Sequence, residues 1–219
     1  MITSPATVHV VNTDRSHTKR LAQMQRAIFP TLTDEELLHA EHYLRHIELF
    51  PDGQFTALAH IHDKWVVAGS TSTFRIHMDA LHQPHTFLEI VDNGWFGHHN
   101  PRGAWLYGGD LSVHPDYRGL GLGSKFYDAR RDLVRRLNLR GEVAGGMLPG
   151  YDRHRHHLSI EGYVRRVVAG ELRDPTLSVQ LKNGFVVKGI LYDHITDPRA
   201  DNCATLIVRE NPYYNRARA

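Results

Sequence analysis

The chain has 219 residues, enough to bury one sizeable core, and its 41% hydrophobic and 23% charged residues are ordinary for a globular protein. Its formal net charge is only +2, so no global charge excess indicates a nucleic-acid partner. The single cysteine excludes an internal disulfide, and no apolar run approaches the ~20 residues of a membrane span.

No linker, repeat or low-complexity run divides the sequence, and its start lacks the charged and then apolar pattern of a signal peptide. We therefore expect a single domain over residues 1–219, a cytoplasmic location and no membrane partner. Cys203 lies in a β-like run and is interpreted as a small core residue, not as a nucleophile.

The first third of the chain shows capping residues followed by apolar residues at helical spacing, and then alternating segments typical of strands. In chain order, these patterns predict a strand over 7–11, a helix beginning at Asp14, a helix from 33–36 to Ile47, and a hairpin of strands 54–61 and 65–76. The segment 77–102 is less regular and contains a short helix candidate over 86–92.

The remaining sequence alternates strand and helix patterns. It predicts a strand over 105–113, a helix through Leu137, a strand over 143–147, helices over 160–168 and 177–181, and strands over 185–192 and 204–208.

The most informative segment runs from Leu111 to Ser124, where a predicted strand enters three alternate glycines, Gly119, Gly121 and Gly123, followed directly by a helix. Glycine lets the backbone turn tightly and approach a ligand closely, and the helix start offers unpaired N–H groups and the positive end of its dipole. The segment therefore predicts a cradle for a phosphate or pyrophosphate.

Two familiar phosphate-binding patterns do not fit. A Walker A loop requires Gly-Lys-Ser/Thr, whereas Ser124 here precedes Lys125. A dinucleotide fingerprint requires Gly-x-Gly-x-x-Gly within repeated βαβ units; the spacing differs, and Glu142 stands alone where a ribose-binding acid is expected. A glycine turn without a ligand is the remaining alternative, and three alternate glycines would weaken a merely structural turn.

The pattern Arg118-x-x-Gly121-x-Gly123 after a strand closely resembles motif A of the GNAT acyltransferase superfamily, and the order of predicted elements is the GNAT order. This resemblance implies an α/β (α+β) fold with a mixed central sheet, splayed between its fourth and fifth strands and covered by helices on both faces. It also implies that acetyl-CoA is the co-substrate. The residues expected to bind it are Leu111, Ser112, Val113, Arg118, Gly119, Leu120, Gly121, Leu122, Gly123 and Ser124.

A narrower resemblance covers most of the chain. The segments 145–151, 163–170, 174–175, 180–185 and 211–213 are similar to GNAT domains that precede a nitrilase-type carbon–nitrogen hydrolase, and Gly184-Phe185 resembles the Gly-Phe of motif B. The 219 residues contain no hydrolase sequence. Met147 stands where many relatives carry a basic residue, which leaves the acceptor undetermined.

The resemblance implies direct attack of an amine on the thioester, with backbone N–H groups around Leu111 to Val113 bonding the carbonyl oxygen. For the general base, Asp110 is preferred, Glu89 is the second candidate, and a relayed water is open.

The general acid is harder to assign, because the position four residues before the motif B glycine, a tyrosine in many GNAT enzymes, is Gln180 here. Tyr151, which follows the second splayed strand, is predicted as proton donor, with Tyr163 as the alternative. A packed Tyr151 ring with its hydroxyl bonded to the backbone is the competing interpretation.

Two clusters of basic residues can be explained without a bound ligand. The histidines of the segment 152–157 are interleaved with arginines, so we expect an exposed loop and no metal. A series of arginines has the spacing of a solvated helix face, with contact to the 3′-phosphate of CoA as an alternative. These are Arg130, Arg131, Arg135, Arg136 and Arg140.

The leading hypothesis is an acetyl-CoA-dependent N-acyltransferase that modifies a primary amine of a small molecule or peptide. The alternative is a non-catalytic acyl-CoA-binding regulatory module, which the loss of the usual tyrosine keeps open. Neither a nucleic acid nor a membrane is expected as a partner, and the oligomeric state is open, a homodimer included.

Overall fold

The computed structural model describes residues 7–78 and 85–218. These residues form a seven-stranded mixed sheet in the order β1-β2-β3-β4-β5-β7-β6. Its strands are β1 (Val8–Asn12), β2 (Gln54–Ile61), β3 (Lys64–Ile76), β4 (Trp105–Val113), β5 (Gly141–Met147), β6 (Val186–Leu191) and β7 (Ala204–Glu210). The α-helices are α1 (Thr18–Ile28), α2 (Ala40–Leu49), α3 (Phe87–Ile90), α4 (Leu122–Arg136), α5 (Ile160–Val168) and α6 (Leu177–Lys182).

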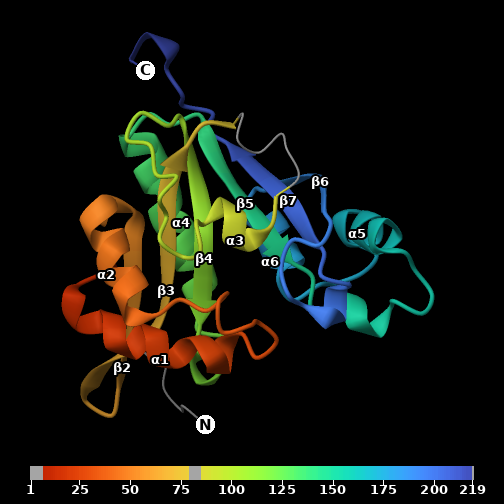
Figure 1. Cartoon of the computed structure of the whole chain (residues 1–219), viewed down its shortest axis with the longest axis horizontal. Coiled ribbons are helices and arrows are strands. Elements are labelled where there is room, and N and C mark those ends of the chain that lie inside the picture. Colours follow the sequence, from red (N-terminus) through yellow and green to blue (C-terminus); the bar gives the residue numbers. More distant parts are fainter. Residues whose placement is uncertain (1–6, 79–84, 219) are drawn as a thin grey trace.

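Helices cover both faces of the sheet (Figure 1). Helices α1, α2 and α3 lie on one face, called here the α1 face, where Tyr107 and Val143 pack with Phe74, Ile90 and Phe96. Helices α4, α5 and α6 lie on the other, the α4 face, where the side chains of Ala144, Tyr127 and Ile207 belong to a second cluster. The predicted mixed sheet with helices on both faces is confirmed.

Strands β4 and β5 are the central parallel pair, and they separate halfway along their length. Their pairing runs from Trp105–Gly141 to Gly108–Ala144 and ends there, although β4 continues to Val113 and β5 to Met147. Beyond that point β4 pairs only with β3, and β5 pairs only with β7. The predicted splay between the fourth and fifth strands is therefore confirmed.

A bulge in β4 lies where the splay begins. Thr73 of β3 pairs with Gly108 and Ser72 pairs with Asp110, so Gly109 has no partner on β3. An extra residue in one strand bends it and re-aims the side chains that follow. Here it places Asp110 on the α1 face, beside Ser70 and Ser112, so a carboxyl group reaches the open part of the sheet.

The start predicted for the second helix, at the 33–36 capping box, is wrong. Glu36 does accept hydrogen bonds from the N–H and hydroxyl of Thr33, but its second carboxylate oxygen accepts from the N–H of Thr196, 160 residues away. That long-range contact holds residues 34–37 in a turn, and α2 begins only at Ala40, after its N-cap His39.

The prediction that the arginines of α4 lie on a solvated face is wrong for Arg130. Arg130 is 2% exposed and forms an ion pair with buried Glu142 of β5, which also pairs with Arg209 of β7. Its spacing from Phe126 and Leu133 puts it on the apolar stripe of the helix, which the charge pattern alone concealed.

Candidate active site

The glycine loop forms an open cradle at the start of α4. Gly119 and Gly121 have φ values of 82° and 74°, in the left-handed region that favours glycine, and Gly121 is the N-cap residue of α4. A Cβ atom added to Gly119, Gly121 or Gly123 would meet no described atom within 4 Å. Gly121 provides no side chain to cap the helix start, and the space around the three glycines is open, as anion binding requires.

The leucines of the loop have a different role from its glycines. The Leu122 side chain is buried with Phe126 of α4, and Leu120 packs against the same cluster. Both side chains therefore fix the loop to the core, while the backbone around them faces outward. This arrangement fits backbone recognition of a pyrophosphate.

A groove of about 490 Å³, called here the loop groove, leads from the glycine loop along the splayed strands. Its lining includes Arg118 and Gly123 at the loop, Leu111 and Val113 of β4, and Met147 of β5. Of the predicted co-substrate residues, Leu111, Val113, Arg118 and Gly123 line this groove, whereas the Ser112 side chain faces Ser70 on the other face of the sheet.

A second, smaller space of about 160 Å³, called here the central cavity, occupies the splay itself. It is lined on the α1 face by Gln25, Glu36 and Asp110, and on the α4 face by Tyr127, Arg130 and Gln180. The two spaces share lining residues, namely Phe29, Leu111, Tyr127, Met147 and Thr176.

Glycines keep this cavity open across the sheet. A Cβ atom on Gly145 would lie 2.7 Å from Nε2 of His194, and one on Gly146 would lie 2.6 Å from Oε1 of Gln180. On β4, Gly108 leaves room for the Arg130 guanidinium. Any larger residue at these positions would fill the splay or displace the polar groups beside it.

Of the predicted catalytic residues, Asp110 is the one that lines the central cavity. Its Oδ2 accepts hydrogen bonds from the hydroxyls of Ser112 at 3.1 Å and Ser70 at 3.5 Å. Burial raises the pKa of Asp110 to about 7, against the opposing effect of these hydrogen bonds, that of Gln25 and the charge of Arg130. A carboxyl group with a pKa near neutrality is suited to accept and release a proton at pH 7.

His194 is a second polar group at the cavity, and no sequence pattern pointed to it. Its Nδ1 lies 2.9 Å from the carbonyl oxygen of His85, which can only accept, so Nδ1 carries the proton. Burial lowers the pKa of His194 to about 4. The ring is therefore neutral at pH 7 and presents the lone pair of Nε2 beside Gly145.

The structure does not bring the other two predicted catalytic residues to this cavity. The Glu89 carboxylate accepts from the N–H and hydroxyl of Thr86, where it caps the exposed helix α3, and these bonds lower its pKa. The Tyr151 hydroxyl donates to the carbonyl of Leu158 at 2.8 Å, in a ring that is 4% exposed. This arrangement agrees with the competing interpretation, in which the Tyr151 ring is packed and its hydroxyl is bonded to the backbone.

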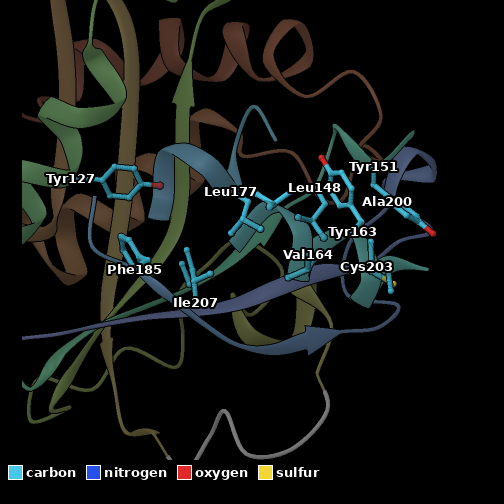
Figure 2. Packing of buried hydrophobic residues seen from close by; sticks show 13 residues of the cluster. Tyr127, Leu148, Tyr151, Tyr163, Val164, Leu177, Phe185, Ala200, Cys203 and Ile207 are labelled. Atoms are coloured by element: carbon cyan, nitrogen blue, oxygen red, sulfur yellow. The ribbon is translucent and has the colours of Figure 1, made fainter. Parts of the chain in front are cut away.

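The tyrosine alternative, Tyr163, is also held elsewhere. Its hydroxyl donates to Oδ2 of buried Asp174 at 2.9 Å, and it packs against Tyr151. Figure 2 shows both rings together at one end of a hydrophobic cluster and Tyr127 at the other end. Tyr127 is the tyrosine that lines both the loop groove and the central cavity.

No group of three or more metal-ligating side chains is arranged to hold an ion within residues 7–78 and 85–218. In the histidine-rich loop, Arg155 forms ion pairs with Asp152 and Asp201, and His154 packs on the ring of Tyr163. In the same described segments, no helix has the length and apolarity needed to cross a bilayer.

Solved structures share this fold. The GphF GNAT-like decarboxylase in complex with isobutyryl-CoA superposes with a TM-score of 0.76 at 22% identity, over 93% of this chain and 99% of that one. The loading GNATL domain of CurA from Lyngbya majuscula gives 0.77 at 16% identity, over 94% and 98%. Naa50 of Arabidopsis thaliana, solved with a CoA-containing bisubstrate analogue, gives 0.56 at 13% identity, over 93% and 98%.

Sequence relatives decide the family. The chain is 32% identical over 200 residues to YkwB of Bacillus subtilis (strain 168), an uncharacterized N-acetyltransferase, and the match covers 91% of this chain and 87% of YkwB. The chain belongs to the GNAT superfamily. This GNAT chain is also 35% identical over 204 residues to YhcX of the same strain, named a probable hydrolase.

The match to YhcX covers 93% of this chain but only 38% of YhcX, so the chain spans well under half of that relative. No family model matches the chain. The superfamily resemblance based on motif A is thus confirmed, whereas the narrower resemblance to domains that precede a nitrilase-type hydrolase stays a prediction.

Proposed function

We propose that this protein transfers the acyl group of a CoA thioester, acetyl-CoA in the first instance, to the primary amine of a compact small molecule. One observation carries the proposal. The loop groove at the glycine cradle shares five lining residues with a cavity in the splay that is also lined by Asp110 on the opposite face of the sheet. A thioester entering from the loop and an amine entering from the α1 face would meet in the splay.

The residues present fit a CoA thioester. The open N–H groups at Gly121 to Ser124 suit its pyrophosphate, and the backbone of Leu111 to Val113, which pairs only with β3, suits its pantetheine chain and acyl carbonyl. Gln180 adds a buried Oε1 with no hydrogen-bond partner among the described residues, which an amide N–H of pantetheine would satisfy.

In the proposed reaction, Asp110 accepts the proton that the amine loses as its nitrogen bonds to the thioester carbon. The serine hydroxyls of Ser70 and Ser112 hold the carboxylate in position. Neutral His194 presents an acceptor for a second N–H or O–H group of the acceptor molecule. Because the central cavity is only about 160 Å³, a compact amine fits it better than a peptide does.

Three similar proteins support a CoA thioester as co-substrate. YkwB is named an N-acetyltransferase, GphF was solved with isobutyryl-CoA, and Naa50 was solved with a CoA analogue. The proposed setting is the cytoplasm, as expected from the sequence.

Decarboxylation of a carboxyacyl-CoA is a second candidate, since GphF is named a decarboxylase. Its supporting observation is Arg130, a buried cation at the cavity whose Nε has no hydrogen-bond acceptor among the described residues. The triad of Arg130, Glu142 and Arg209 carries one excess positive charge, which a substrate carboxylate would neutralise.

The test combines ligand binding with a search for turnover. Acetyl-CoA at ~100 times its dissociation constant should raise the free energy of unfolding by about 2.7 kcal/mol. A panel of small primary amines, with peptides as controls, should then release free CoA and yield an N-acyl product, identified by mass spectrometry.

An unchanged melting temperature with saturating CoA thioester would exclude both candidates. Binding of acetyl-CoA with no acceptor in the panel favours the non-catalytic acyl-CoA-binding module. Release of CO₂ from a carboxyacyl-CoA without an amine establishes the second candidate in place of the first.

A further inference from the structure

The transfer proposed above leaves a thiolate that must be protonated, and no obvious acid stands at the expected position. The family resemblance puts a tyrosine where this chain has Gln180, and an amide side chain is not a useful proton donor. Which residue supplies that proton is a question that rests on the proposed function.

Tyr127 occupies the junction between the loop groove and the central cavity. It lines both, its ring is 5% exposed, and the side chain of Gln180 lies beside its hydroxyl, where it lowers the pKa of the phenol. Because Oε1 of Gln180 has no hydrogen-bond partner among the described residues, Nε2 is the atom that can bond the hydroxyl; Nε2 can only donate, so the phenolic hydrogen remains available. The thioester sulfur lies at this junction in any molecule that places pantetheine in the groove and its acyl group in the cavity.

Charged groups from three elements influence the ionisation of the Tyr127 phenol. Arg130 lies on its own helix with its Cζ 5.4 Å from the ring centroid, Glu142 comes from β5, and Arg209 from β7. Both arginines favour the phenolate and Glu142 opposes it, while burial raises the pKa of Tyr127. The phenol is therefore protonated at pH 7 and its conjugate base has two cations nearby.

We propose that Tyr127 donates a proton to the departing sulfur of CoA, and that Gln180 holds its hydroxyl in position for this step. The phenol thus reaches the leaving group from α4, and the glutamine that stands at the usual tyrosine position becomes its support.

Protons and electrons balance in this step. The amine nitrogen forms the new C–N bond and gives a proton to Asp110, while the C–S bond breaks and its electron pair goes to sulfur. Tyr127 transfers its phenolic proton to that sulfur, forming CoA thiol. Solvent then returns a proton to the phenolate as Asp110 releases one, so no proton is gained or lost overall.

The first experiment needs no acceptor. CoA thiol is bound to the protein, and its ionisation is followed by the ultraviolet absorbance of the thiolate as pH is raised. A hydrogen bond from Tyr127 to the thiolate lowers the pKa of the bound thiol, so Tyr127→Phe should raise that pKa by about one unit or more. Gln180→Met should raise it by less, because the hydroxyl is present but no longer held.

Tyr192→Phe is the matched control. Tyr192 is exposed, and its hydroxyl donates to Glu161 at 2.6 Å, away from both cavities. This substitution should leave the bound thiol titration unchanged. Retention of CoA affinity by the Tyr127→Phe variant, measured by thermal shift, shows that the fold and the groove are intact.

The second experiment uses an acceptor found as described above. Tyr127→Phe should lower kcat roughly 10²-fold or more with little change in the KM for acetyl-CoA, and remove the alkaline limb that deprotonation of the phenol gives to the pH profile. An unchanged thiol titration in Tyr127→Phe overturns the inference even where amines are acylated. A shifted titration supports it even where no amine reacts, in which case the transfer function alone fails.

Discussion

Among single residues, Asp110 shows how the surroundings of a carboxyl group change its pKa and so decide which chemical role it can take. The sequence places an acid just before the end of a strand, but the charge state of that acid depends on neighbours 40 residues away and on the opposite helix layer. Ser70, Gln25 and Arg130 each stabilise its carboxylate, and burial outweighs them. The resulting pKa of about 7 makes Asp110 titrate where enzymes work.

Asp110→Asn should therefore abolish the acidic limb of the pH–rate profile. In the wild-type protein, kcat/KM should rise with pH through about 7 as Asp110 loses its proton; in the variant the remaining rate, lower by roughly 10²-fold, should be flat over that range. Asp132→Asn, on the exposed side of α4, is the control. A limb that persists in the Asp110→Asn variant would assign the base to another group.

The same substitution has a consequence for stability that needs no substrate. The pKa of Asp110 in the folded protein is raised above the ordinary value of 3.8. Its favourable contribution to the free energy of unfolding is therefore complete below pH 4 and is lost as pH rises through about 7. Relative to wild type, Asp110→Asn should become progressively more stable over that window in urea unfolding. A constant difference would show that the carboxylate is already fully solvated.

Residue type alone also misplaced two side chains. Tyr151 looks like a proton donor because it follows a splayed strand, yet its hydroxyl is bonded to a backbone carbonyl. Arg130 looks like a surface cation, yet it is buried with Glu142. The partner that buries Arg130 comes from another element of the chain, which no local pattern reveals.

Among the elements, the glycine loop was predictable because its requirements are local. Positive φ at Gly119 and Gly121 and an uncapped helix start follow from the order of residues within a few positions. The splay was only implied by family resemblance, because it depends on where the β4–β5 pairing stops. The glycine pairs at 108–109 and 145–146 are its local signature, since they leave space that other residues would fill.

Gly121→Glu tests the loop. Its side chain would put a negative charge in the cradle and a non-glycine residue at φ 74°, so the stabilisation by acetyl-CoA, about 2.7 kcal/mol at ~100 times the dissociation constant, should disappear. Gly170→Glu is a matched control, because Gly170 also has a positive φ of 77° and open space around its Cβ position, away from both cavities.

The two variants should lose similar stability without ligand, about 1 kcal/mol from backbone strain. Only the Gly121→Glu variant should fail to respond to acetyl-CoA in a thermal shift measurement. A normal ligand response in that variant would mean that the loop does not hold the pyrophosphate.

Across the whole molecule, the order of elements could be predicted from the sequence, while the proposed acceptor side of the site could not. Glu36 meets Thr196 and His194 meets His85, contacts that join distant parts of the chain across the α1 face. Hydrophobic periodicity identifies each strand and helix separately and says nothing about such pairs. The sequence therefore predicts the proposed CoA-binding side of the site, which is built from one local motif, but not the proposed amine-binding side, which is assembled from distant segments.

Buried neutral histidines should make the molecule sensitive to acid. His46 is 1% exposed, stacks on Phe96 at a centroid distance of 3.6 Å, and donates from Nε2 to the carbonyl of Gly94. Burial lowers its pKa to about 3, and that of His194 to about 4. Both folded pKa values lie below the ordinary value of 6.5, so the contribution of these histidines to the free energy of unfolding is complete above pH 6.5 and is lost as pH falls. This pH dependence is opposite in sign to that of Asp110, whose contribution is lost as pH rises.

Because these contributions have opposite signs, the pH dependence of the wild-type stability does not identify a single group. The measurement is therefore a comparison of the wild-type protein with one variant. His46→Gln keeps a donor for the Gly94 carbonyl but cannot take up a proton; it should be less stable at pH 7.5 through loss of the ring stack. From pH 7.5 to pH 5 the wild-type protein should lose roughly 2 kcal/mol more than this variant, the effect of holding one histidine neutral well below its unfolded pKa. Urea unfolding at the two pH values measures this difference, with exposed His156→Gln as the control. Equal pH dependence in His46→Gln and wild type would mean that His46 takes up its proton in the folded state without cost, and the closed packing of α2 against Phe96 would have to open in solution.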